Sequence, residues 1–317
     1  MGFRNPFRFV VRPNTGSTLP SAGDVGEIYV GDVGYGRFEE LNTIRYPGTN
    51  CGWPIYEGIT PTPGDYYTQS FSILNKDELN PLYGVNGCTR QYFTFAELLK
   101  QATADNNTTV YNPCDPTKPI TGSIGNRYFH RVPALDWAHY YDSARVRVFN
   151  GNNAAVAQIG TTASGVTGVP FRGSSVTAGC WYTGNLFPPN YKNTYLVGDY
   201  VGNWIKDIVF ESYNQIRSVT DLATNITGFI NLVENPVDGS LFAVDYGQNL
   251  IRRIGYGGNI PPVVKIAADK TYGPGPLSVQ FNGSSSYDPE GGQLTYSWDF
   301  KTEPTDQRYL TWWLPWF

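Results

Sequence analysis

The chain of 317 residues has little charge of either sign and no long apolar run. Charged residues make up 16% of it, where an average globular protein has about 25%, and the formal net charge is −4. A protein that binds nucleic acid through the phosphate backbone needs a basic face, so this balance argues against a nucleic-acid partner. Because no apolar stretch approaches the length of about 18 residues that a spanning helix requires, the sequence predicts no membrane span.

Histidine, methionine and cysteine are also scarce: the chain has 2 His, 1 Met and 4 Cys. Asn-x-Ser/Thr sequons begin at Asn106, Asn107, Asn225 and Asn282. Together these features predict a secreted, extracellular protein, and since Met1–Pro6 has no apolar segment of a signal peptide, we expect a mature form or a fragment. Cys88 and Cys114 lie in one loop-like segment and are the expected disulfide; the alternative is that all the cysteines, including Cys51 and Cys180, are buried free thiols.

Aromatic residues and turn formers are abundant. Aromatics make up 15% of the chain, which also contains 35 Gly and 23 Pro. Disordered chains are poor in aromatics, and helical bundles are poor in glycine and proline. The composition therefore predicts an all-β, turn-rich protein.

The segments 27–34, 194–200 and 240–246 share a pattern in which a strand ends at an aspartate, and 229–233, 204–210 and 250–256 are predicted strands beside them. The pair Asp238-Gly239 is typical of a tight hairpin. Asp199 and Asp245 are 46 residues apart. The blades of a β-propeller repeat every roughly 40–50 residues, so this spacing favours a propeller. The alternative is a β-sandwich with similar turns.

Three segments do not follow this pattern of strands that end at an aspartate. Residues 54–127 form a predicted insertion in a domain that covers 1–257, and within it Phe93–Ala102 is the expected helix. Residues 258–300 contain predicted strands at 263–267, 277–281 and 295–300, as in a β-sandwich. The tail 301–317 has no clear periodicity.

The most specific motif runs from Gly31 to Asn42 (GDVGYGRFEELN) and continues with Gly48–Pro54 (GTNCGWP), and it is preceded by Arg4-Asn5-Pro6. Segments 173–205 and 238–256 carry further matching landmarks. Residues 1–257 resemble the glucose/sorbosone dehydrogenase family of soluble quinoprotein sugar dehydrogenases. Residues 261–300 resemble a polycystic-kidney-disease (PKD) type domain.

The resemblance implies about three to four blades of a six-bladed-type β-propeller, followed by an incomplete Ig-like PKD sandwich. It implies a secreted enzyme that, in its full-length form, oxidises a sugar hydroxyl with pyrroloquinoline quinone (PQQ) as acceptor and Ca²⁺ as metal. Arg4 and Asn5 fall on quinone-contacting positions, and Asp32, Gly34 and Tyr35 on the metal loop, where carboxylate and carbonyl oxygens suit Ca²⁺. The implied partner is a sugar or polysaccharide.

Each of these residues also has a structural interpretation. Arg4 could cap the start of the chain, and Asp32 could bind backbone amides, as Asp199 and Asp245 are expected to do. Trp53, Trp181 and Tyr182 could line a ligand site or belong to the core. Glu39 and Glu40 are expected to hold the loop.

The chain departs from the family pattern in ways that bear on activity. Only three residues precede Arg4, whereas the family has blades there that carry a catalytic histidine, and neither His130 nor His139 falls at that position. We therefore expect no turnover by this chain alone. The second hypothesis is a non-catalytic extracellular scaffold that binds carbohydrate or protein. A partial propeller would also expose open blade faces through which copies could associate.

Overall fold

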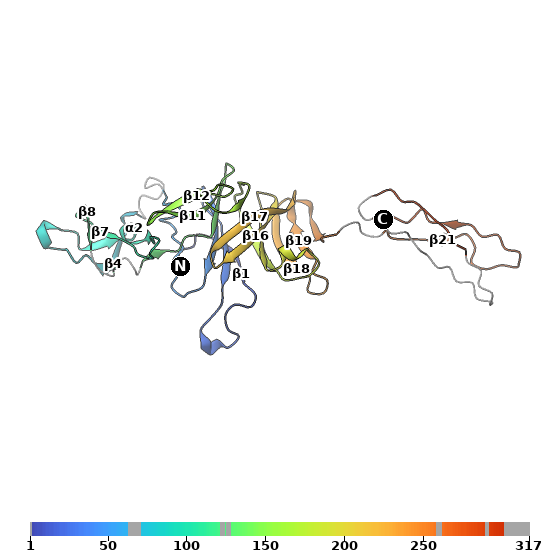
Figure 1. Cartoon of the computed structure of the whole chain (residues 1–317), viewed down its shortest axis with the longest axis horizontal. Coiled ribbons are helices and arrows are strands. Elements are labelled where there is room, and N and C mark those ends of the chain that lie inside the picture. Colours follow the sequence, from blue (N-terminus) through green and yellow to red (C-terminus); the bar gives the residue numbers. More distant parts are fainter. Residues whose placement is uncertain are drawn as a thin grey trace. The chain divides into compact units, whose positions relative to one another are not determined.

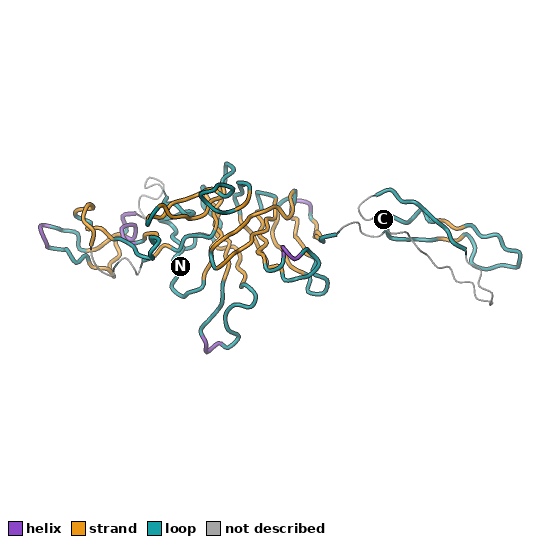
Figure 2. Tube along the Cα trace, in the orientation of Figure 1, coloured by secondary structure: helices purple, strands orange, loops and turns teal. Residues whose placement is uncertain are grey.

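The computed structural model describes residues 2–62, 71–120, 124, 128–257, 262–288 and 292–300. Among these residues the regular structure is almost entirely β-strand, and α2 (Phe95–Leu98) and the short 3-10 segments are single turns (Figures 1 and 2). The chain divides into two compact units, Met1–Tyr256 and Gly257–Phe317. The prediction of an all-β protein is confirmed. Within the described ranges, no helix has the length and apolar character needed to cross a membrane.

The first unit contains three larger sheets. The first sheet has the order β1-β2-β3-β10-β11-β12, and all its pairings are antiparallel. Its strands are β1 (Pro6–Val11), β2 (Ile28–Asp32), β3 (Phe38–Ile44), β10 (Leu135–Ala138), β11 (Ala144–Asn150) and β12 (Asn153–Gln158).

The second sheet has the order β13-β17-β16-β15-β14, and the third has the order β18-β19-β20. The second consists of β13 (Thr167–Gly168), β14 (Val176–Tyr182), β15 (Thr194–Asp199), β16 (Trp204–Ser212) and β17 (Gln215–Thr224). The third consists of β18 (Phe229–Glu234), β19 (Leu241–Asp245) and β20 (Leu250–Ile254). The predicted strands in these regions are thus present, with ends that differ by a few residues.

The three sheets repeat one arrangement. Each begins as an antiparallel meander whose first strand, β1, β14 or β18, lies at an edge. Strand β14 packs on β1 and β2 of the first sheet, and β18 packs on β14 and β15 of the second. The sheets therefore follow one another in a stack with the same relative placement at both junctions.

At each junction, a glycine in the second strand of one sheet allows the next sheet to approach closely. A β-carbon on Gly31 would collide with the side chain of Val176, the first residue of β14. A β-carbon on Gly198 would collide with the ring of Phe229, the first residue of β18. Because the same contact recurs at both junctions, glycine is required just before the terminal aspartate of β2 and of β15.

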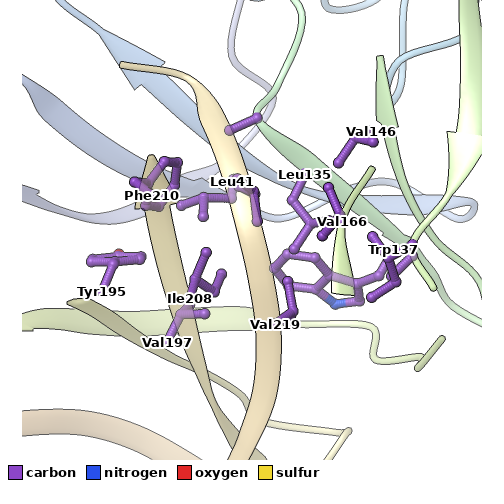
Figure 3. Close-up of a cluster of buried hydrophobic side chains, with 14 of the residues drawn as sticks. Leu41, Leu135, Trp137, Val146, Val166, Tyr195, Val197, Ile208, Phe210 and Val219 are labelled. Atoms are coloured by element: carbon purple, nitrogen blue, oxygen red, sulfur yellow. The ribbon is translucent and has the colours of Figure 1, made fainter. Parts of the chain in front are cut away.

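The hydrophobic core lies between the sheets. One cluster joins the first and second sheets, with Leu41, Leu135 and Trp137 on one side and Tyr195 and Ile208 on the other (Figure 3). A second cluster joins the second and third sheets. Trp181 belongs to the first cluster and Tyr182 to the second, so both are core residues.

The two outer sheets each present apolar side chains to solvent. On β1 these are Phe7, Phe9 and Val11, of which Phe9 is 69% exposed. On the third sheet they are Val233, Phe242 and Ile251, of which Ile251 is 72% exposed. Aligned apolar side chains of this kind mark a surface suited to further packing.

The predicted insertion between β3 and β10 forms small sheets of its own. Its elements are β4 (Leu74–Leu79), η2 (Val85–Gly87), β5 (Tyr92–Thr94), α2 (Phe95–Leu98), β6 (Lys100–Gln101), β7 (Val110–Asn112), β8 (Asp115–Ile120) and β9 (Phe129–His130). Outside it lie η1 (Pro20–Ala22), η4 (Pro189–Tyr191) and η5 (Tyr246–Gln248). The predicted disulfide between Cys88 and Cys114 is confirmed, and Cys51 and Cys180 are free.

The expected helix at Phe93–Ala102 is wrong in extent, because α2 is one turn with a capping box at Thr94 and Glu97. Strand β6 follows at once and pairs in parallel with β9. That long-range pairing ends the helix.

In the described part of the second unit, β21 (Ala267–Ala268) pairs with β22 (Phe281–Asn282), and Val263 forms a single antiparallel bridge with Tyr287. The predicted strand at 295–300 is irregular there, although the rings of Phe281, Trp298 and Phe300 gather with centroids 5.6 to 6.3 Å apart. The tail 301–317 lies outside the described residues.

Candidate functional site

The segment before β1 and the loop after β2 form one hydrogen-bonded cluster. The buried carboxylate of Asp32 accepts hydrogen bonds from the backbone N–H groups of Arg4 (2.9 Å) and Asn5 (2.7 Å). Burial raises the pKa of Asp32, and the two backbone hydrogen bonds oppose that shift. The structure therefore brings Arg4, Asn5 and Asp32 together, and Asp32 has the amide-binding contacts of its structural interpretation.

The side chain of Arg4 reaches the predicted metal loop. Its guanidinium donates to the carbonyl oxygens of Val33 (3.0 Å) and Gly34 (2.9 Å). The guanidinium carbon lies 5.2 Å from the ring centroid of Tyr35 and 5.9 Å from that of Trp53. A cation within about 6 Å of an aromatic face is attracted by the ring quadrupole. Since Tyr35 is 57% exposed, a cationic and aromatic surface lies open beside the loop.

These contacts do not fit Ca²⁺ at the predicted position. The carbonyl oxygen of Gly34 already accepts from a guanidinium, and both oxygens of Asp32 accept from backbone amides. A fixed positive charge on the carbonyl groups repels a second cation. Among the described residues, no group of three or more His, Cys, Asp or Glu side chains is placed to hold a metal ion.

The loop is held mainly by Glu57, to which the sequence analysis assigned no role. One oxygen of its buried carboxylate accepts from the backbone N–H groups of Tyr35 (2.9 Å), Gly36 (2.8 Å), Arg37 (2.8 Å) and Phe38 (3.4 Å). Successive inward N–H groups form a concave anion site, which here is filled by the protein's own side chain. The signal in the sequence was its position, three residues after the motif segment Gly48–Pro54 and directly before Gly58.

Glu39 and Glu40 hold the surroundings of the loop, as expected. Glu39 accepts from the backbone of Gly34 (3.2 Å) and Val176 (2.7 Å), so it links the first sheet to the second. Glu40 accepts from the backbone of Gly58 (2.6 Å). Burial raises the pKa of both carboxyls, and that of Glu40 lies well above its usual range.

Neither histidine is placed to accept a proton from a substrate. His139 is buried against Glu39 with an N···O distance of 2.7 Å. His130 is buried, stacks on Tyr56 with centroids 3.8 Å apart, and lies 3.1 Å from the carbonyl oxygen of Cys51. Burial lowers the pKa of His130 to about 3, so its ring is neutral near pH 7.

In each of the other two sheets, an aspartate at the end of a strand has a role similar to that of Asp32. Asp199 accepts from the backbone N–H groups of Ser174 and Ser175, just before β14. Asp245 accepts from the hydroxyl of Thr227, just before β18 (2.9 Å). Each aspartate thus fastens the start of the first strand, but the other partners differ. Asp199 also accepts from the indole N–H of Trp137 (3.0 Å), and Asp245 pairs with Arg252 (2.6 Å). In the first sheet the guanidinium of Arg4 instead contacts the loop carbonyls and two aromatic rings.

Comparison with known proteins gives no independent assignment. No protein-family model matches the sequence, and no curated protein matches it significantly.

Proposed function

We propose that the first unit forms part of a β-propeller of the glucose/sorbosone dehydrogenase kind. The observation that carries this proposal is the repeat of three edge-first meanders, stacked through Gly31 on Val176 and Gly198 on Phe229. An ordinary two-sheet sandwich gives no reason for a third sheet to repeat the same contact. A propeller repeats the packing of one blade on the next around its ring. In the same way, we propose that residues 258–300 belong to a PKD-like domain.

The ligand that suits the loop is a planar anion, and we propose PQQ as that ligand. Arg4 would bind a carboxylate of the quinone through its charge, and the rings of Tyr35 and Trp53 would contact the planar ring system. When bound, the quinone supplies the electron acceptor for oxidation of a sugar hydroxyl. We propose no calcium step, because Asp32 and Gly34 are already occupied by N–H donors.

A titration with PQQ tests this proposal. We expect quenching of tryptophan fluorescence with a micromolar dissociation constant, and about tenfold weaker binding by Arg4→Gln, because a charge-assisted hydrogen bond is lost. Arg8→Gln is the matched control, since Arg8 is exposed on β1 and forms no ion pair among the described residues. Absence of binding by the native chain at about 100 times that concentration rejects the assignment.

A non-catalytic scaffold that binds carbohydrate or protein is the second candidate. It is favoured by the use of Arg4 on the loop carbonyls and by the buried positions of His130 and His139. This candidate predicts binding of a polysaccharide with no binding of quinone. The sugar dehydrogenase proposal predicts the reverse order of affinities.

We also propose that the protein is secreted. The disulfide between Cys88 and Cys114 supports an oxidising compartment. The four sequon asparagines, Asn106, Asn107, Asn225 and Asn282, are all exposed and so accessible to a glycosyl transferase. Expression through a secretory pathway should give a mass that falls on treatment with an endoglycosidase; an unchanged mass together with retention in the cell argues against secretion.

A further inference from the structure

A hollow of about 400 Å³ lies in the first unit between the turn 46–50, which follows β3, and the insertion. Its apolar lining consists mainly of aromatic rings from Tyr46, Phe95, Tyr128 and Phe129. Tyr46 is 62% exposed and Phe95 is 43% exposed, so their rings are accessible from solvent. Pockets that combine aromatic walls with a few polar groups are typical of small-molecule sites.

Arg131 provides charge at this hollow. Its guanidinium carbon lies 4.9 Å from the ring centroid of Tyr213, which fixes one of its flat sides. In the described part of the chain, no carboxylate lies within ion-pair distance of Arg131, whereas Arg145 pairs with Asp136 at 2.6 Å. An arginine held on an aromatic ring without a carboxylate partner keeps its N–H edge available for an anion.

Arg147 adds a second positive charge close by. Burial, and after it the charge of Arg131, lowers the pKa of Arg147, so the two guanidinium groups repel each other. Glu211 lines a neighbouring hollow with Arg147 but forms no ion pair with it. Two neighbouring arginines that lack an acidic partner favour a negatively charged ligand.

We propose that this hollow binds an acidic saccharide, with the sugar ring against Tyr46 and Phe95 and its carboxylate on Arg131. The aromatic faces suit the C–H faces of a pyranose ring. The guanidinium suits a carboxylate, which it can bind through two parallel hydrogen bonds. Asn50, which also lines the hollow, has an amide group to offer to sugar hydroxyls. This site lies between the turn 46–50 and the insertion, and it does not depend on the quinone assignment.

Isothermal titration of the full chain with a trisaccharide of galacturonic acid tests the proposal, with maltotriose as the neutral counterpart. We expect binding with a dissociation constant near or below about 1 mM, and at least tenfold weaker binding of maltotriose. Arg131→Gln should weaken binding of the acidic trisaccharide at least tenfold, and Arg131→Lys should weaken it less, because the charge remains. Tyr46→Ala should weaken binding of both sugars.

Tyr83→Ala is the matched control, since Tyr83 is an exposed tyrosine of the same insertion that does not line the hollow. Each variant is checked for an unchanged circular dichroism spectrum. The proposal is overturned if the native chain binds no acidic trisaccharide at about 10 mM, if maltotriose binds equally well, or if Arg131→Gln has no effect. It is also overturned if sodium acetate at the same concentration displaces the trisaccharide, because the site would then recognise only a carboxylate.

Discussion

Asp207 is a buried acid at the junction of the second and third sheets, and it makes stability depend on pH. It lies on β16 opposite Leu196, it is 3% exposed, and its Oδ1 atom has no hydrogen-bond partner. Burial raises its pKa to about 6, and a hydrogen bond from Thr194 opposes the shift. The phenol of Tyr191 lies close enough for the charge of Asp207, after burial, to raise its pKa, and a phenol brings no positive charge to Asp207.

The sign of the effect follows from the raised pKa. The folded protein holds the proton more tightly than the unfolded chain, whose pKa is near 3.8, so ionisation costs stability. The cost is absent below about pH 4, grows between the two pKa values, and is complete above about pH 6. The difference between the folded and unfolded pKa values corresponds to about 3 kcal/mol.

Asp207→Asn should therefore stabilise the first unit by about 1–3 kcal/mol at pH 8 and by little at pH 4, where the native carboxyl is already neutral. Urea unfolding followed by tryptophan fluorescence measures the difference at both pH values. The matched control is Asp142→Asn, since Asp142 is an exposed acid of the same unit and its removal should matter little at either pH. An equal gain at pH 4 and pH 8, or a loss at pH 8, would refute the reasoning.

Three further predictions concern the stack and the insertion. Gly198→Ala should destabilise the first unit by about 1–3 kcal/mol, because its β-carbon would meet the ring of Phe229, and an unchanged urea midpoint would contradict the close junction. Replacing both Cys88 and Cys114 by alanine should lower the stability of the insertion by about 3 kcal/mol, because the disulfide closes a loop of 26 residues. The loss should appear as faster proteolysis within the insertion, and equal cleavage rates would show that the bridge is not needed. If copies associate through their apolar outer faces, Phe9→Glu should lower the sedimentation coefficient measured at high concentration, and a native chain that stays monomeric there excludes this association.

Local patterns predicted the three strands of the third sheet, β15 and β16 of the second and β2 of the first, and they did not predict the other strands of the first two sheets. The alternating apolar residues, terminal aspartates and Asp-Gly turns of the predicted strands are properties of short segments. The expected helix at Phe93–Ala102 was wrong in extent because Lys100 and Gln101 pair with Phe129 and His130, and periodicity contains no information about a partner so far along the chain. The strand expected at 295–300 is not formed, although its alternation is present.

The sequence predicted which residues belong to the candidate site better than it predicted the contacts between them. The motif placed Arg4, Asp32 and Gly34 together, as the structure does. It did not reveal that the side chain of Arg4 binds the loop carbonyls, because the direction of a long side chain is not encoded in spacing. The role of Glu57 was missed for the same reason, since its four amide partners lie about 20 residues earlier in the chain.

The recurring glycine contact has an implication for how such a molecule can change during evolution. The second sheet carries both a glycine, Gly198, that accepts a side chain of the next sheet and a residue, Val176, that packs on the glycine of the sheet before it. A duplicate of that sheet would therefore already possess both parts of the contact. The gain or loss of a whole sheet would then need few compensating substitutions, whereas replacement of one of these glycines would disturb two sheets at once. The architecture is thus tolerant of copying and sensitive to point replacement at Gly31 and Gly198.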